Sequence, residues 1–136
     1  GLQVLFEHSE EGDTPCLGLF SGRVTRFPDA AMRDTAGNRL KVPHMGWNNV
    51  RQAYAHPLWS GIRDGARFYF VHSYFVAPTD PALAVGYADY PFEFACACAR
   101  DNIFAVQFHP EKSAVDGLQL LTNFMNWDGT LQPGQQ

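Results

Sequence analysis

Several features that mark common protein classes are missing from this sequence of 136 residues. It has no long apolar run and no secretory leader, which argues against a membrane span and against export. It has only three cysteines, an odd number without a CxxC pair, and its histidines are scattered, so no zinc-ligand set is recognisable. Together these absences predict a cytoplasmic protein in a reducing compartment, without a metal.

Basic residues are also few, and they form no run. The formal net charge is −4, and arginines are interspersed with acids, so we expect no nucleic-acid partner. By contrast, 46% of the residues are hydrophobic and 14% aromatic, which is enough for a sizeable core. No repeat or interdomain linker is visible. The sequence therefore predicts one domain over residues 1–128 and a disordered tail over residues 129–136, which are polar and rich in Gly, Gln and Pro.

The middle of the chain is rich in predicted strands. A hairpin is expected over residues 17–27, around Ser21 and Gly22, and strands at 40–42 and 47–50 flank a predicted turn at 43–46. A long aromatic strand covers residues 67–76. Further strands are expected at 83–88, 92–99 and 103–108, with a turn at 100–102. Within residues 92–99, Cys96 and Cys98 alternate with alanines, which predicts buried thiols on one strand face.

Helical spacing is found near the two ends of the chain and in one short turn at 57–61. Leu2, Leu5 and Phe6 recur at i, i+3 and i+4, which predicts a helix at the start. A second helix is expected over residues 113–127, where Ser113 and Asp116 have the spacing of a capping box. Its apolar residues continue at helical spacing, namely Val115, Leu118, Leu121 and Met125. The pattern as a whole is α/β, with a strand-rich middle and a C-terminal helix.

A histidine and a glutamate stand two residues apart just after the last predicted strand. Side chains at i and i+2 of an extended segment share a face, and Pro110 keeps His109 out of the helical region. We therefore expect His109 and Glu111 to be held extended, side by side. A carboxylate bonded to one ring nitrogen fixes the tautomer and leaves the other nitrogen to take a proton from a thiol or hydroxyl. This pair predicts a general base and its orienting carboxylate.

Four motifs occur in order along nearly the whole chain: Gly1-Leu2-Gln3, Pro43-His44-Met45-Gly46-Trp47-Asn48, Tyr69-Phe70-Val71-His72-Ser73-Tyr74 and Gln107-Phe108-His109-Pro110-Glu111-Lys112-Ser113. Together they resemble the class I, triad-type glutamine amidotransferases. The Phe-His-Pro-Glu element is shared across that superfamily. The motif over residues 43–48 resembles, more narrowly, the glutaminase subunit of imidazole glycerol phosphate synthase. This resemblance implies a flavodoxin-like, doubly wound domain, incomplete here because its parallel core strands would lie mostly upstream.

The resemblance also implies roles for single residues. His109 matches the general base and Glu111 the carboxylate that orients it. Gln3 matches a glutamine that holds the substrate glutamine, and Ser73 and Tyr74 match the loop that binds the α-carboxylate of the substrate. His72, just before that loop, is expected to be a packed strand residue. Three further positions match the face that docks onto the cyclase subunit: Trp47, Asn48 and Lys112.

The nucleophile of the family is a cysteine in a G-x-C-x-G elbow, and Gly1 matches the second glycine of that elbow. We therefore expect the nucleophile to lie upstream of Gly1 and this chain, taken alone, to be inactive. The three cysteines present do not have the strand, elbow and helix setting of a nucleophile. Cys16 follows a loop composition, and Cys96 and Cys98 have the pattern of buried strand residues.

The reaction implied by the resemblance is hydrolysis of glutamine to glutamate and ammonia, without a metal or organic cofactor. Ammonia would then pass to the cyclase subunit in a heterodimer of histidine biosynthesis. Two alternatives stay open. The chain could belong to a glutaminase subunit for aminobenzoate, anthranilate or guanylate synthesis, against which the 43–48 motif argues, or it could be a noncatalytic binding module. The codons upstream of Gly1 would discriminate, since a glutaminase requires the elbow there.

Overall fold

The computed structural model describes residues 2–11 and 14–130, and the elements below are those of these residues. The strands are β1 (His8–Ser9), β2 (Thr14–Pro15), β3 (Gly22–Arg26), β4 (His44–Asn49), β5 (Arg51–Gln52), β6 (Arg67–His72), β7 (Tyr74–Pro78), β8 (Ala84–Asp89), β9 (Glu93–Arg100) and β10 (Ile103–Val106). One α-helix, α1, covers Ala114–Asn126. Short 3-10 turns are η1 (Leu2–Leu5), η3 (Asp29–Ala31), η4 (Pro57–Trp59), η5 (Pro81–Leu83) and η6 (Pro110–Lys112).

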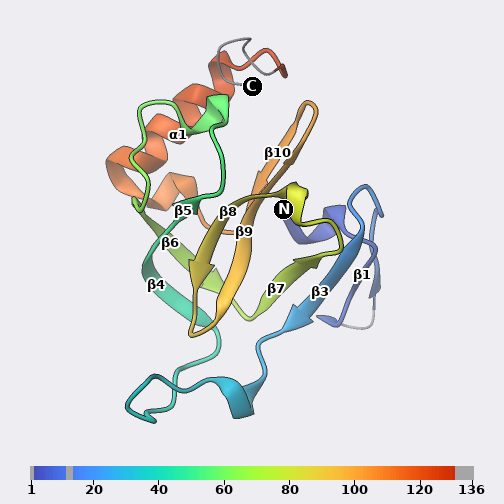
Figure 1. The fold of residues 1–136 in the computed structure, drawn as a ribbon, viewed down its shortest axis with the longest axis vertical. Helices are drawn as coiled ribbons and strands as arrows, with labels where there is room; N and C mark the ends of the chain where they lie inside the picture. The colour runs from blue at the N-terminus through green and yellow to red at the C-terminus, as the bar shows by residue number, and fades with distance from the viewer. Residues whose placement is uncertain (1, 12–13, 131–136) are drawn as a thin grey trace.

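Most strands join one mixed sheet in the order β2, β1, β3, β7, β9, β8, β5, and β10 also pairs with β9. Strands β4 and β6 form a separate two-stranded sheet. Among the described strands only β1 and β3 run parallel, and the other pairs are antiparallel. Helix α1 lies next to β6, and the segment around η3 projects away from the sheets (Figure 1). The α/β class, the strand-rich middle and the C-terminal helix are confirmed.

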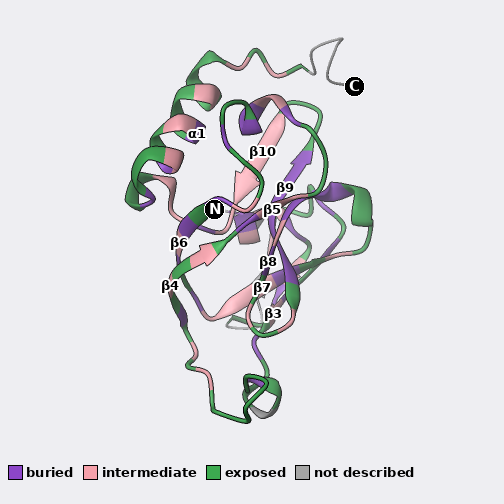
Figure 2. Cartoon of the chain, turned by 60° about the vertical axis from the view of Figure 1, so that its left-hand side comes forward, coloured by how far each residue is buried: buried purple, intermediate pink, exposed green. Residues whose placement is uncertain are grey.

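Strand β9 forms the centre of the core. Its six inner residues, from Phe94 to Ala99, are all buried, and Figure 2 shows β8 and β9 as the most buried part of the fold. The prediction of two buried thiols is confirmed, since Cys96 and Cys98 are both fully buried. Cys96 packs in the larger hydrophobic cluster, with Phe27, Phe70 and other aromatic residues, and Cys98 packs in the smaller one. Small side chains let other elements approach this strand closely.

Three strand predictions are wrong because the true pairing partners lie far away in the sequence. Residues 17–21 form no strand, and β3 pairs with β1 and β7 instead of closing a hairpin. Residues 40–42 are not a strand either, and the expected turn at 43–46 is mostly strand, because β6 pairs with β4 from His44 onward. The long strand over 67–76 breaks at Ser73, where the chain leaves the two-stranded sheet and joins the larger one.

The helix predictions are partly confirmed. The start of the chain forms one 3-10 turn, η1, and η4 forms the expected turn after His56. Helix α1 is present, but its apolar stripe is not its core face: Val115, Leu118, Leu121 and Met125 are exposed. The buried residues of α1 are Gly117 and Leu120. Within the part of the chain that the structure describes, none of the helices qualifies as a membrane-spanning segment.

Ser113 precedes α1 but its side chain makes no capping bond, so the predicted capping box is wrong. The reason is that the Ser113 hydroxyl is engaged elsewhere. It donates to the His109 carbonyl oxygen at 2.5 Å and accepts from the Tyr69 backbone N–H at 3.0 Å. Ser113 is buried and thereby ties the segment after β10 to β6.

The described chain continues past α1 to Thr130, whose carbonyl oxygen accepts from the Trp127 indole N–H at 2.8 Å. Residues 131–136 of the predicted tail lie outside the described residues.

Candidate active site

His109 follows β10 and immediately precedes η6, and its backbone is held on both sides. Its N–H donates to the Tyr69 carbonyl oxygen at 2.9 Å, and its own carbonyl accepts from Ser113 and from the Lys112 N–H. His109 is extended, with φ −104° and ψ 96°, as predicted from the following proline. The expected extended segment ends there, because residues Pro110–Lys112 turn into a 3-10 helix. The turn, and not a strand, brings Glu111 back beside His109.

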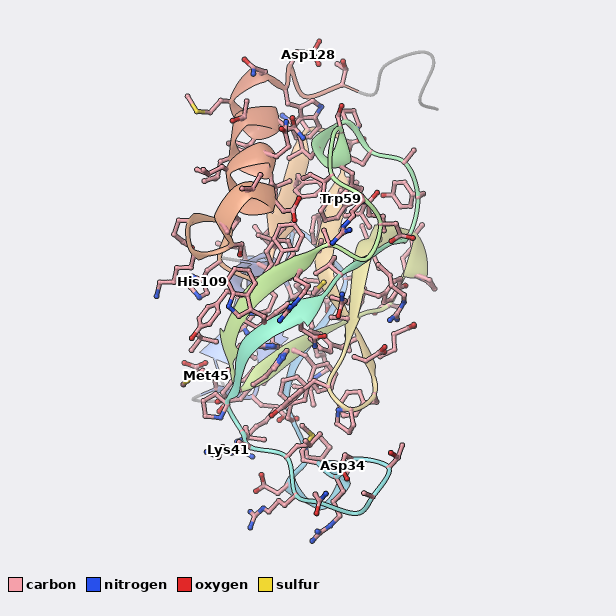
Figure 3. All side chains as sticks on the ribbon, turned by 90° about the vertical axis from the view of Figure 1, so that its left-hand side faces the viewer. Asp34, Lys41, Met45, Trp59, His109 and Asp128 are labelled. Carbon is pink, nitrogen blue, oxygen red and sulfur yellow. The ribbon has the colours of Figure 1, made fainter. Side chains whose placement is uncertain are left out.

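The two side chains meet directly. His109 Nδ1 lies 3.1 Å from Glu111 Oε1, with His109 41% and Glu111 54% exposed. A carboxylate oxygen only accepts, so Nδ1 carries the hydrogen and Nε2 of neutral His109 has the lone pair. This arrangement presents a basic nitrogen at an accessible position. Figure 3 shows His109 at the edge of the molecule, below the start of α1, with Met45 further along the same edge.

A cleft of about 850 Å³ opens beside His109. Four of the residues singled out from the sequence line this one cleft, although they come from both ends and the middle of the chain: Gln3, Ser73, Tyr74 and His109. Gln3 is on η1, and Ser73 and Tyr74 form the corner between β6 and β7. Glu111 does not line the cleft and reaches it only through His109.

Gln3 is fixed by two hydrogen bonds in the wall of the cleft. Its Nε2 donates to the Tyr74 carbonyl oxygen at 3.3 Å and to Gln107 Oε1 at 3.0 Å. The carbonyl oxygen of Ser73 accepts from the Phe27 N–H at 3.1 Å, which holds the other side of the corner. Gln107 was not predicted as a site residue, although it stands in the same motif as His109, two residues before it. Its side-chain oxygen accepts one of the two hydrogen bonds that hold the Gln3 amide.

His72 lines the same cleft, and, as expected, it is packed: only 6% of it is exposed. Its Nε2 lies 2.9 Å from Nδ1 of His44, which is also buried. Burial lowers the pKa of His44 to about 3, with His72 adding to the effect. Burial also lowers the pKa of His72 to about 4, and the bond to the Tyr74 carbonyl only partly offsets this. Both imidazoles are therefore neutral at pH 7. No sequence pattern signalled this pair.

The cysteines of the described chain do not line this cleft. Burial raises the pKa of the Cys98 thiol to about 12, and burial followed by the nearby Cys98 also raises that of Cys96. Neither thiol can supply a thiolate at neutral pH. Within residues 2–11 and 14–130, no group of three or more His, Cys, Asp or Glu side chains is arranged to hold a metal ion.

Of the three residues predicted to face a partner, Trp47 and Asn48 lie on opposite sides of β4 and Lys112 lies on η6. Trp47 points outward, is 45% exposed, and makes an edge contact with Tyr69 at 6.0 Å between ring centroids, so it is not a core residue. Met45 and Val71 are exposed opposite each other on the same sheet face. Asn48 points to the other side and donates to the Asp89 carbonyl oxygen at 2.7 Å. Lys112 is exposed on η6, directly after Glu111.

The cleft thus brings together a histidine bonded to a carboxylate and a glutamine whose amide is fixed by two hydrogen bonds. Residues 1–127 match the family Glutamine amidotransferase class-I, and the chain belongs to this family. Within the family it is 69% identical over 128 residues to imidazole glycerol phosphate synthase subunit HisH of Thiobacillus denitrificans. It is 67% identical over 127 residues to the subunit of the same name from Dechloromonas aromatica.

The two alignments cover 94% and 93% of this chain but only 56% and 59% of the relatives, so the chain spans somewhat more than half of their length. The fold is also similar to the crystal structure of a putative GMP synthase protein from Thermoplasma acidophilum. That comparison has a TM-score of 0.57 and 16% identity, over 77% of this chain and 47% of the other. At this identity the likeness concerns the fold alone.

Proposed function

We propose that this chain belongs to a glutaminase subunit of imidazole glycerol phosphate synthase, which hydrolyses glutamine in the cytoplasm and passes ammonia to a cyclase subunit. The single observation that carries the proposal is the convergence of Gln3, Ser73, Tyr74 and His109 on one cleft, with Glu111 bonded to His109. The names of the relatives at 69% and 67% identity support the choice of this synthase within the family.

In the proposed reaction a cysteine thiol, which we expect upstream of Gly1, attacks the side-chain carbonyl carbon of glutamine. Nε2 of His109 takes the thiol proton, and the carbonyl becomes a tetrahedral oxyanion. His109 then donates that proton to the departing nitrogen, and ammonia leaves as the acyl-enzyme forms. Water attacks the thioester, His109 accepts its proton and returns it to the cysteine sulfur, and glutamate is released. Glu111 keeps the hydrogen of His109 on Nδ1 throughout and stabilises the imidazolium.

The cleft wall supplies groups for binding the substrate. Gln3 is held with its amide in the cleft, and the Ser73–Tyr74 corner can offer backbone N–H groups to the α-carboxylate of glutamine. These assignments provide for the side-chain amide and the α-carboxylate of the ligand. No cofactor is required for this chemistry.

Docking onto the cyclase is proposed for the exposed face around Trp47 and for Lys112. Trp47 is a large aromatic side chain without a core position, and Met45 and Val71 extend an apolar surface beside it. Lys112 stands next to Glu111 on η6, so a partner that contacts Lys112 lies close to His109 and Glu111. Asn48 is turned away from this face, and its proposed role is to hold β4 in place for docking.

The proposal is tested with the full-length protein and the cyclase subunit of imidazole glycerol phosphate synthase. Glutamate release from glutamine is measured for the unmodified protein, for His109→Ala and for His56→Asn, a control histidine outside the cleft. We expect cyclase-dependent release that is lost in His109→Ala and kept in His56→Asn. Activity that survives His109→Ala but disappears when Cys16, Cys96 or Cys98 is replaced would contradict the assignment of the site.

A further inference from the structure

A buried pair of histidines lies at the cleft, where His72 forms part of the lining and His44 does not. His44 on β4 and His72 on β6 face each other in the register of the two-stranded sheet, with His44 Nδ1 2.9 Å from His72 Nε2. His72 Nδ1 lies 2.7 Å from the Tyr74 carbonyl oxygen. Only 3% of His44 and 6% of His72 is exposed. The pair therefore connects the core to the corner that forms one side of the cleft.

The Tyr74 carbonyl fixes the direction of these bonds. A carbonyl oxygen only accepts, so Nδ1 of His72 carries the hydrogen, and Nε2 of the neutral ring accepts. His44 must then donate from Nδ1, which leaves its Nε2 as an acceptor. The Asn48 side-chain nitrogen lies 3.4 Å from that Nε2 and 2.7 Å from the Asp89 carbonyl oxygen, so its two hydrogens have two acceptors. One arrangement of hydrogens satisfies every group in the series.

The surroundings of His44 keep this arrangement in place. Its ring is stacked between Tyr90, at 3.9 Å and 17°, and Phe70, at 4.9 Å and 20°. Burial lowers the pKa of both His44 and His72. While the hydrogen of His44 stays on Nδ1, a second hydrogen on His72 would set two donors against each other at 2.9 Å. The aromatic neighbours also prevent the His44 ring from turning away.

The hydrogen bonds of the histidine pair end at the Tyr74 carbonyl oxygen, which also holds a side chain that lines the cleft. The Tyr74 carbonyl accepts from His72 and also from Gln3 Nε2, at 3.3 Å. Both lone pairs of this oxygen are thereby engaged. A shift of the Tyr74 peptide would displace the amide of Gln3 and the backbone N–H groups of the corner together.

We propose that His44 and His72 are positioning residues for glutamine binding, forming a neutral hydrogen-bonded relay that holds the Tyr74 peptide and, through it, Gln3. The proposal rests on the proposed glutaminase function. The relay acts on the substrate through Tyr74 and Gln3 and takes no part in proton transfer to the substrate. Its loss should weaken glutamine binding more than it slows the chemical step.

The first test is spectroscopic and does not depend on activity. Long-range ¹⁵N–¹H correlation spectra of the full-length protein at pH 7 report the tautomer of each histidine. We expect both His44 and His72 to be neutral with the hydrogen on Nδ1. In His44→Phe, which keeps an aromatic ring between Tyr90 and Phe70, the amide signals of Ser73 and Tyr74 should shift. A charged ring, an Nε2–H tautomer of His72 or unchanged Ser73 and Tyr74 signals would overturn the relay.

The second test separates positioning from general stability. With the cyclase present, His44→Phe should raise the KM for glutamine about fivefold to tenfold, the size of one net hydrogen bond, and change kcat less than about twofold. His56→Phe is the matched control, because His56 is equally buried and accepts from the Leu58 N–H at 3.1 Å, outside the cleft. It should lower the melting temperature similarly and leave KM unchanged. His44→Asn, whose amide nitrogen can take the place of Nδ1, should restore much of the KM.

An equal KM change in both phenylalanine variants, or a KM for His44→Phe within twofold of the unmodified protein, would refute the positioning role. If the unmodified protein and cyclase release no glutamate, the proposed function fails. The tautomers of His44 and His72 and the amide signals of the corner would then still decide whether the relay exists.

Discussion

Mild acid is expected to destabilise this protein well above the pH at which its carboxylates titrate. The cause is the burial of three histidines in their neutral form: His44, His56 and His72. Burial lowers their pKa values to about 3, about 4 and about 4, from an ordinary value of 6.5. In the unfolded chain each imidazole gains a proton as the pH falls below 6.5, while in the folded protein it does not. The unfolded state therefore binds more protons, and the free energy of unfolding falls with pH.

The magnitude follows from these values. At pH 5 a histidine with a pKa near 4 in the folded protein lowers the free energy of unfolding by about 2 kcal/mol relative to neutral pH. Three such residues give a loss of about 6 kcal/mol, a large part of the 5–15 kcal/mol that typically stabilises a domain. Two carboxylates with lowered pKa values, Asp34 and Asp128, are bonded to nearby N–H and hydroxyl groups and titrate below this range. Between pH 6.5 and pH 5 the change in the free energy of unfolding therefore reports the three buried histidines and not these two carboxylates.

The assay is urea unfolding at pH 7.5, 6.5, 5.5 and 5.0, followed by tryptophan fluorescence. The free energy of unfolding should fall by about 1 kcal/mol per pH unit for each of the three histidines below pH 6. The His56→Leu variant removes one of them and should lower the slope by about one third. Equal free energies at pH 7.5 and pH 5 would show that the histidines are not held neutral in the folded protein, and would refute the reasoning.

Three further predictions concern the site and its support. Glu111→Gln in the full-length protein should lower glutamine turnover about 100-fold or more with an unchanged melting temperature, because the orienting charge is lost, and a fully active variant would remove Glu111 from the mechanism. Trp47→Ala and Lys112→Ala should weaken cyclase binding, by about 2 kcal/mol for the tryptophan, with an unchanged KM for glutamine, as measured by titration and by assays at saturating cyclase. Gly117→Ala should destabilise the protein by about 1–3 kcal/mol in urea unfolding, because a Cβ there would overlap the backbone of η6, whereas Leu118→Ala on the exposed helix face should change little.

Local patterns in the sequence were sufficient for part of the fold. The alternation of alanine and cysteine predicted β9, and helical spacing predicted α1, because both signals lie within one element. The break at Ser73 was not predictable, since it depends on β6 and β7 pairing with different strands far away in the chain. The start of β4 was missed for the same reason.

In the candidate site, too, local spacing predicted some contacts, and contacts set by strand pairing were missed. The spacing of His109 and Glu111 predicted their contact, although a 3-10 turn and not an extended segment brings them together. The pairing of His44 with His72 arises from the register of two strands whose histidines are 28 residues apart, and no local pattern reveals it. The roles of Gln3, Ser73 and Tyr74 came from the family resemblance, and the cleft now supplies a geometry in which those roles can be tested.

The two thiols inside β9 give this chain a built-in reporter of unfolding. Cys96 and Cys98 are fully buried and have raised pKa values, so a thiol reagent cannot reach them, or find them as thiolates, while the sheet is intact. Cys16 is partly exposed and should react first. The slow appearance of doubly and triply modified protein in a mass spectrum would then measure how often the centre of the sheet opens, without any dye or mutation.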